Sequence, residues 1–132
     1  QAAPAYDDVT AEVFDALTDL LDELHAAGVP AEHVAVDPGI GFGKTLEHNL
    51  QLLRELRQLR SLGRPVLVGA SRKRFIGDVT GVDEPAARLG GSVGAAAVAV
   101  ANGASMVRVH DVAATVEAVR VAHAIQTGWS EH

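Results

Sequence analysis

The chain has 132 residues, a length that suits one domain, and 48% of them are hydrophobic, enough to bury a core. Its net charge is −6 and it has no long basic cluster, which argues against nucleic acid or an anionic membrane as the partner. The lack of cysteine excludes disulfides and thiolate metal sites, and no apolar run is long enough for a transmembrane helix. We also see no signal peptide and therefore expect a soluble, cytoplasmic protein.

Two amphipathic helices are predicted in the first half of the chain. Residues 7–28 form the first, because apolar side chains recur there at helical spacing. Asp8 or Thr10 is placed to cap its start, and Gly28 is placed to end it. A leucine stripe over residues 46–63 predicts the second helix.

Two more helices are predicted in the second half, over residues 85–103 and 113–126. The first of these is rich in alanine and glycine and contains Gly90, Gly91 and Gly94. Glycine costs roughly 1 kcal/mol in a helix interior relative to alanine. We therefore expect these three glycines to be favoured by close approach to a neighbouring element.

Valine-rich runs predict three strands, at residues 33–36, 65–70 and 105–112. Each is followed by a predicted helix, a pattern typical of a parallel sheet covered by helices in an α/β fold. Three strands cannot close a barrel, since a (β/α)8 barrel needs eight. We therefore interpret the chain as part of a larger α/β domain and expect the missing part to precede Gln1.

The glycine-rich stretch VAVDPGIGFGKT at residues 34–45 fits neither of two familiar phosphate-binding motifs. A phosphate loop needs a glycine five positions before Gly43, where Pro38 stands, and a dinucleotide fingerprint needs a glycine where Lys44 stands. The more informative residue is Asp37, which ends the first apolar run.

Polar residues follow all three predicted strands. Asp37 ends the first, the run GASRKRF ends the second, and Arg108 and His110 lie two apart on the third, so that they share one face. Because the carboxyl ends of parallel strands meet at one edge, we expect a carboxylate, a lysine, two arginines and a histidine to converge there.

Each of these residues also has a structural interpretation. Asp37 before Pro-Gly suits a turn, residues 71–73 suit a solvated loop, and Arg108 suits an ion pair with an aspartate inside the sheet. Their joint occurrence at three strand ends favours a functional site. Arginine binds phosphate oxygens, a carboxylate suits a flat ring with two adjacent N–H donors, and Phe42 is placed to cover an aromatic ring.

The motifs VDPGIGFGK, GASRKRFIG and RVHD, in this order and spacing, resemble the C-terminal half of the dihydropteroate synthase family, within the pterin-binding barrel group. The resemblance runs over essentially the whole chain. It implies a (β/α)8 TIM barrel in which residues 1–132 supply the last three βα units, the C-terminal half of the domain. The N-terminal half is then absent from this chain, which alone is expected to be inactive.

The resemblance implies a transferase of folate biosynthesis. Such an enzyme condenses 6-hydroxymethyl-7,8-dihydropterin diphosphate with 4-aminobenzoate to give 7,8-dihydropteroate and diphosphate, and sulfonamides target it. Mg²⁺ is the implied cofactor, and its ligand lies in the missing half, so that no metal ligand is expected here. A homodimer of the complete protein is also implied, with the last two helices as candidates for its surface.

By the same resemblance, Lys73, Arg108 and His110 are the catalytic residues. Asp37 holds the N–H groups of the pterin ring, Lys73 contacts that ring, and Arg108 and His110 bind the departing diphosphate. Ser71, Arg72 and Phe42 line the 4-aminobenzoate side. Gly41 lets the backbone approach the ligand closely.

Two alternatives stay open. One is a pterin- or folate-binding methyltransferase barrel, which needs Asp37 but no diphosphate clamp. The other is a catalytically inactive half-barrel fragment or paralogue. A half-barrel exposes sheet edges, so we expect a lone 132-residue chain to associate.

Overall fold

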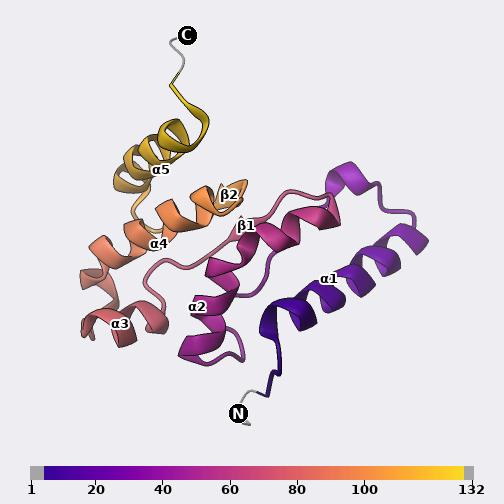
Figure 1. The fold of residues 1–132 in the computed structure, drawn as a ribbon, viewed down its shortest axis with the longest axis horizontal. Coiled ribbons are helices and arrows are strands. Elements are labelled where there is room, and N and C mark those ends of the chain that lie inside the picture. Colours follow the sequence, from indigo (N-terminus) through magenta and orange to yellow (C-terminus); the bar gives the residue numbers. More distant parts are fainter. Residues whose placement is uncertain (1–4, 130–132) are drawn as a thin grey trace.

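The computed structural model describes residues 5–129, so that Gln1, before which further chain is expected, lies outside the described part. Five α-helices and two strands follow one another in this part (Figure 1): α1 (Val9–Ala26), α2 (Leu46–Arg54), β1 (Leu67–Val68), α3 (Arg74–Thr80), α4 (Leu89–Ala101), β2 (Met106–Val107) and α5 (Val112–Thr127). Three 3-10 helices lie between them: η1 (Ala31–His33), η2 (Leu56–Leu62) and η3 (Pro85–Ala87). Within the described residues, no helix has the length and apolar character needed to cross a membrane.

A small parallel sheet organises the molecule. Strands β1 and β2 pair in parallel, with Leu67 opposite Met106. A single parallel bridge joins Val36 to Val66, on the other side of β1. Three chain segments therefore run side by side in chain order, which confirms the predicted parallel α/β arrangement.

The strands are shorter than predicted. The run 33–36 contributes only the bridge at Val36, and its first residue belongs to η1. Proline has no backbone N–H, so Pro38 cannot extend the ladder as a donor. The valine pattern located the strands correctly but overestimated how far their pairing continues.

The observed helices differ from the predicted ones. The predicted helix 46–63 is α-helical only to Arg54 and then continues as η2 up to Gly63, which ends it at a φ of +78°. The tighter 3-10 turn places residues three apart on one side, so that Leu56 and Leu59 both face the core. Helix α3 was not predicted, because a seven-residue helix with an internal glycine is too short to show helical periodicity.

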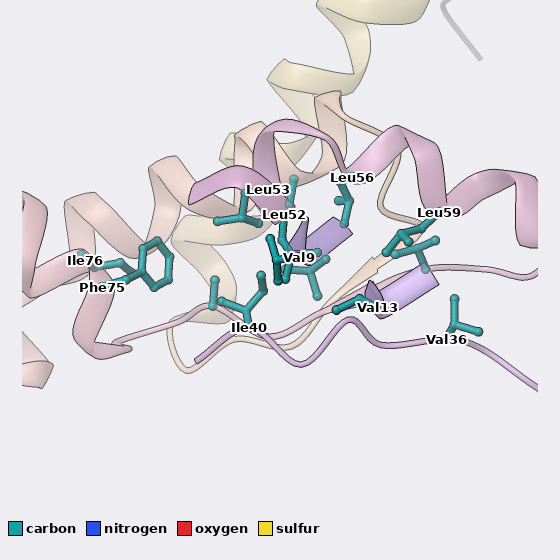
Figure 2. Close-up of a cluster of buried hydrophobic side chains, with 14 residues drawn as sticks. Val9, Val13, Val36, Ile40, Leu52, Leu53, Leu56, Leu59, Phe75 and Ile76 are labelled. Carbon is teal, nitrogen blue, oxygen red and sulfur yellow. The ribbon is translucent and has the colours of Figure 1, made fainter. Parts of the chain in front are cut away.

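The apolar core lies between the N-terminal part of α1, the helices α2 and η2, and the sheet (Figure 2). Helix α1 buries Val9 and Val13, whereas Leu20 is 53% exposed. The predicted stripe of α1 is therefore fully buried only at its start. The buried members of the core are Val9, Val13, Val36, Ile40, Leu52, Leu53, Leu56, Leu59, Val66, Val68, Ala70, Phe75, Ile76 and Ala99.

Polar contacts fix the start of α1. Asp8 caps the helix by accepting from the Ala11 N–H at 3.3 Å, as predicted. The other candidate cap, Thr10, instead donates its hydroxyl to Glu55 at 2.7 Å and so ties α1 to the end of α2. Hydrogen bonds hold the pKa of Glu55 below its usual range, with the Thr10 hydroxyl as the main cause.

The glycines of α4 are only partly explained by close contact. A Cβ at Gly91 would overlap the Ile76 side chain of α3, so the expected close approach is confirmed there. Gly90 and Gly94 have no atom within 4 Å of such a Cβ, so the expectation is wrong for these two.

We expect Gly91→Ala to lower the free energy of unfolding by about 1–3 kcal/mol, because Ile76 must shift within the core. Gly94→Ala is the matched control on the same helix, and we expect it to raise the free energy of unfolding by about 0.5–1 kcal/mol. Urea unfolding of the two variants measures both changes. Equal changes of the same sign would contradict this account of the α3–α4 contact.

Candidate functional site

Side chains from the first and third parallel segments meet across the middle one. Arg108 follows β2, and its Nη1 lies 3.6 Å from Oδ2 of Asp37. Gly69 follows β1 between them, and a Cβ at this position would overlap the Arg108 guanidinium. Because Gly69 has no side chain, Arg108 can lie against the backbone and reach Asp37, as the strand-end pattern predicted.

Asp37 takes part both in a turn and in the candidate site. Its Oδ1 accepts from the Gly39 N–H at 2.8 Å, which is the turn chemistry expected before Pro-Gly. Its Oδ2 faces Arg108, and the carboxylate stays about one-third exposed. One oxygen thus shapes the loop while the other is available to a ligand and to the arginine.

The only two lysines of the chain both bind the glycine loop, which we define as residues 39–43. Lys44 Nζ donates to the carbonyls of Gly39, at 2.8 Å, and Phe42, at 3.0 Å. Lys73 Nζ donates to the Ile40 carbonyl at 2.5 Å and lies 4.7 Å from the centre of the Phe42 ring. The ammonium groups therefore hold the loop from two sides.

Asn49 is a site residue that the sequence motifs did not predict. It is buried in α2, and its Oδ1 accepts from the N–H of Gly41 at 2.8 Å. Gly41 has a φ of +87°, and the Lys73 side chain packs against it. A signal was present, because Asn49 lies three residues after Leu46 and four before Leu53 and so falls within the leucine stripe.

Ser71 fixes the position of His110. The Ser71 Oγ and the His110 Nδ1 are 2.8 Å apart, and the His110 N–H donates to the same oxygen at 3.3 Å. Ser71 is buried, whereas His110 is exposed. An open hollow of about 130 Å³ lies beside this pair and is lined by Gly69, Ser71, Lys73, Arg108, Val109 and His110.

One expectation about Arg108 and His110 is wrong. Arg108 and His110 were expected on a buried strand face, but β2 ends at Val107 and the Arg108 side chain is 58% exposed. Arg72 and Phe42 do not line the hollow, and their place beside 4-aminobenzoate stays a prediction. The Arg72 guanidinium points to Asp111, 3.4 Å away, and Phe42 is 68% exposed.

Burial and neighbouring cations lower the pKa of Lys73, and Asp37 only partly offsets them. Arg108 is the largest of these cationic neighbours. Burial likewise lowers the pKa of Lys44, again against the opposing effect of Asp37. Both lysines therefore lose their protons more readily than an exposed lysine does.

We expect Arg108→Gln to raise the pKa of Lys73, because it removes a nearby positive charge. The pKa of Lys73 is lower in the folded protein than in the unfolded chain. At pH values between these two pKa values the unfolded chain binds more protons, so the free energy of unfolding rises with pH there. NMR titration of the two lysine side chains measures the shift, and Lys44 serves as the internal reference. A Lys73 pKa that does not move in the variant would contradict the effect of the Arg108 charge on Lys73.

The described residues contain no cluster of metal-ligating side chains. Among residues 5–129, no group of three or more His, Asp and Glu side chains is placed to hold a metal ion.

The chain belongs to the pterin binding enzyme family, whose model matches residues 1–110. Among curated relatives, the dihydropteroate synthase of Neisseria meningitidis serogroup C is 48% identical over 126 residues, which cover 95% of this chain and 44% of the relative. That of Escherichia coli K12 is 46% identical over 124 residues, covering 94% and 44%. The chain thus spans about half the length of the curated relatives it matches.

Solved structures give the same picture. The dihydropteroate synthase from Xanthomonas albilineans in complex with 7,8-dihydropteroate matches with a TM-score of 0.92 and 48% identity, over 96% of this chain and 48% of that one. The enzyme from Thermus thermophilus in complex with 4-aminobenzoate matches with a TM-score of 0.86 and 52% identity, over 92% and 46%.

Proposed function

We propose that the protein carrying this chain is a dihydropteroate synthase. It condenses 6-hydroxymethyl-7,8-dihydropterin diphosphate with 4-aminobenzoate to give 7,8-dihydropteroate and diphosphate in folate biosynthesis. The observation that carries the proposal is the convergence of Asp37, Lys73, Arg108 and His110 at three parallel strand ends, within the family's motifs. Relatives solved with dihydropteroate and with 4-aminobenzoate support it.

The chain then supplies the last three βα units of a (β/α)8 TIM barrel, with residues 1–132 as the C-terminal half of the domain. The three parallel segments in chain order support this placement, as does the half-length coverage of the relatives. The N-terminal half completes the pocket and provides the Mg²⁺ ligand. In this proposal the 132-residue chain alone is inactive.

The pterin binds at Asp37 and Lys73. The Asp37 carboxylate accepts from adjacent N–H groups of the ring, a pairing that a flat 2-amino-pyrimidinone offers and that charge strengthens. Lys73 contacts the ring. In the structure its ammonium donates to the Ile40 carbonyl.

The diphosphate binds at Arg108 and His110. The C–O bond between the pterin methylene and the diphosphate breaks, and its electron pair leaves with the diphosphate. Positive charge remains spread over the pterin ring. Arg108 and His110 offer N–H donors to the departing oxygens, and the Ser71 contact keeps the His110 ring in place.

The arylamine approaches from the side of the glycine loop. The neutral amine nitrogen of 4-aminobenzoate attacks the methylene carbon, forms the C–N bond and then loses a proton to water. Ser71, Arg72 and Phe42 line this side, and the same surface accepts sulfonamides. Gly41 has no side chain and a positive φ, which lets the loop backbone pass close to the ligands. Catalysis here rests on positioning the amine rather than on a general base.

Assembly into a homodimer is part of the proposal. The two last helices, α4 and α5, pack against each other and expose apolar side chains, including Val98 and Val121. These helices are the candidates for the dimer surface. Exposed apolar residues on α1 and α5 also support the expectation that the isolated chain associates, which size-exclusion chromatography tests.

The test of the proposed function is diphosphate release by the full-length protein, with and without 4-aminobenzoate. We expect dihydropteroate formation that depends on 4-aminobenzoate, with one diphosphate released for each dihydropteroate formed. A methyltransferase barrel would bind pterin, would not release diphosphate, and would bind free diphosphate no more weakly after Arg108→Ala. Absence of diphosphate release, or diphosphate binding that Arg108→Ala does not weaken, would overturn the proposal. Pterin binding without product would identify an inactive relative.

A further inference from the structure

Arg88 contacts the backbone of Arg72, next to the site residues Ser71 and Lys73. In the contacts described for it, Arg88 binds only backbone oxygens. It stands between η3 and α4, and its guanidinium donates to three carbonyls. Nε binds Val82 at 2.7 Å, Nη1 binds Arg72 at 2.9 Å and Nη2 binds Asp83 at 2.9 Å. The planar fork of arginine suits such a triple contact, which a lysine ammonium on its flexible stem does not reproduce.

The residue held by this fork has an uncommon conformation. Arg72 is the only non-glycine residue among residues 5–129 with a positive φ, at +60°. Its carbonyl accepts from Arg88, and its N–H donates to the buried Ser92 hydroxyl at 2.9 Å. Both polar groups of this one residue are therefore bound by side chains at the start of α4.

The conformation of Arg72 decides where its neighbours point. Ser71 and Lys73 flank it, and both line the hollow with Arg108. If Arg72 returned to a common backbone conformation, the directions of these two side chains would change relative to each other. The Arg72 side chain does not itself line the hollow; its Nε is buried without a partner.

Space for Arg88 depends on Gly77 in α3. A Cβ at Gly77 would overlap the Arg88 guanidinium and would lie 2.8 Å from the Val82 carbonyl oxygen. Glycine disfavours a helix, so its presence inside the seven-residue α3 needs a reason. Packing against Arg88 provides one.

We propose that Arg88, with Ser92, is a positioning residue that holds the Arg72 turn and thereby directs Ser71 and Lys73 into the site. The expected kinetic effect rests on the proposed function. The expected structural effect rests on geometry alone. It predicts that losing the fork disturbs the site locally while leaving the rest of the fold intact.

The experiment uses the full-length protein with Arg88→Lys, with Arg120→Lys on the exposed surface of α5 as the matched control. Hydrogen exchange is followed amide by amide. We expect the Arg72 amide to exchange at least about tenfold faster in Arg88→Lys, although its own partner Ser92 is unchanged. Amides in the middle of α2 and α4 should keep their rates, and uniform acceleration throughout the protein would overturn the inference.

Kinetics give the second readout. We expect Arg88→Lys to lower kcat by about 100-fold, as a displacement of about 1 Å in catalytic groups does, with a smaller change in KM for 4-aminobenzoate. Ser92→Ala, which removes the contact on the other side of Arg72, should lower kcat in the same way. Unchanged turnover in both variants would overturn the inference.

The two readouts separate this inference from the proposed function. Suppose that Arg88→Lys speeds exchange of the Arg72 amide but the wild-type protein has no synthase activity. This result would support the role of Arg88 and overturn the proposed function. Normal synthase activity in Arg88→Lys with unchanged exchange at Arg72 would retain the function and overturn the role of Arg88.

Discussion

Replacing Arg108 by alanine is expected to lower kcat of the full-length protein by about 10²–10³-fold, the cost of removing one preorganised donor to developing negative charge. The guanidinium lies beside Asp37 and over Gly69, and it lines the hollow that His110 also lines. The arginine acts on the leaving diphosphate rather than on the amine. The KM for 4-aminobenzoate should therefore change by much less, and steady-state kinetics with both substrates varied measures the two effects.

Two controls sharpen the Arg108 result. Arg108→Lys keeps the charge but loses the planar fork, so it should recover only part of the lost turnover. Arg120→Ala on α5 removes an exposed arginine that does not line the hollow and should leave turnover unchanged. Equal and small effects of Arg108→Ala on kcat and on 4-aminobenzoate binding would contradict the assigned role.

Replacing Asp37 by asparagine is expected to weaken pterin binding by about 10- to 100-fold, because a hydrogen bond to a charged group contributes about 1.5–3 kcal/mol. Asparagine keeps an oxygen for the Gly39 N–H, so the turn should survive. It presents an amide where the pterin needs an acceptor. Calorimetry with 6-hydroxymethyl-7,8-dihydropterin, which lacks the diphosphate, isolates this interaction from the effect of Arg108.

Asp37→Ala is the companion variant, because it removes both the ligand contact and the turn contact. We expect it to weaken pterin binding further and also to lower the free energy of unfolding, whereas Asp37→Asn should leave the latter nearly unchanged. Wild-type pterin affinity in Asp37→Asn would show that the carboxylate serves only the turn.

The sequence predicted the convergence of the site better than the extent of the elements around it. Parallel strands end at a common edge, so polar residues after three valine runs had to lie near one another, and Asp37 and Arg108 do. The ends of strands and short helices depend on partners distant in the chain. The seven residues of α3 and the change to 3-10 geometry after Arg54 were therefore not readable from periodicity.

Side chains that bind backbone groups were also missed. Lys44, Asn49 and Arg88 are each held by the fold against a loop, and no spacing rule relates them to the groups they bind. Only Asn49 left a trace, as a polar residue within an apolar stripe. The exposure of Leu20 was unpredictable for a different reason, since a helical stripe shows which face is apolar but not what covers it.

In the proposed function, three strand ends form the pterin and diphosphate side of a synthase site. Its most direct test is a single turnover of the full-length protein with excess enzyme, 6-hydroxymethyl-7,8-dihydropterin diphosphate and 4-aminobenzoate, followed by mass spectrometry. We expect one dihydropteroate and one diphosphate for each pterin substrate consumed. Binding of both substrates without dihydropteroate formation would contradict it.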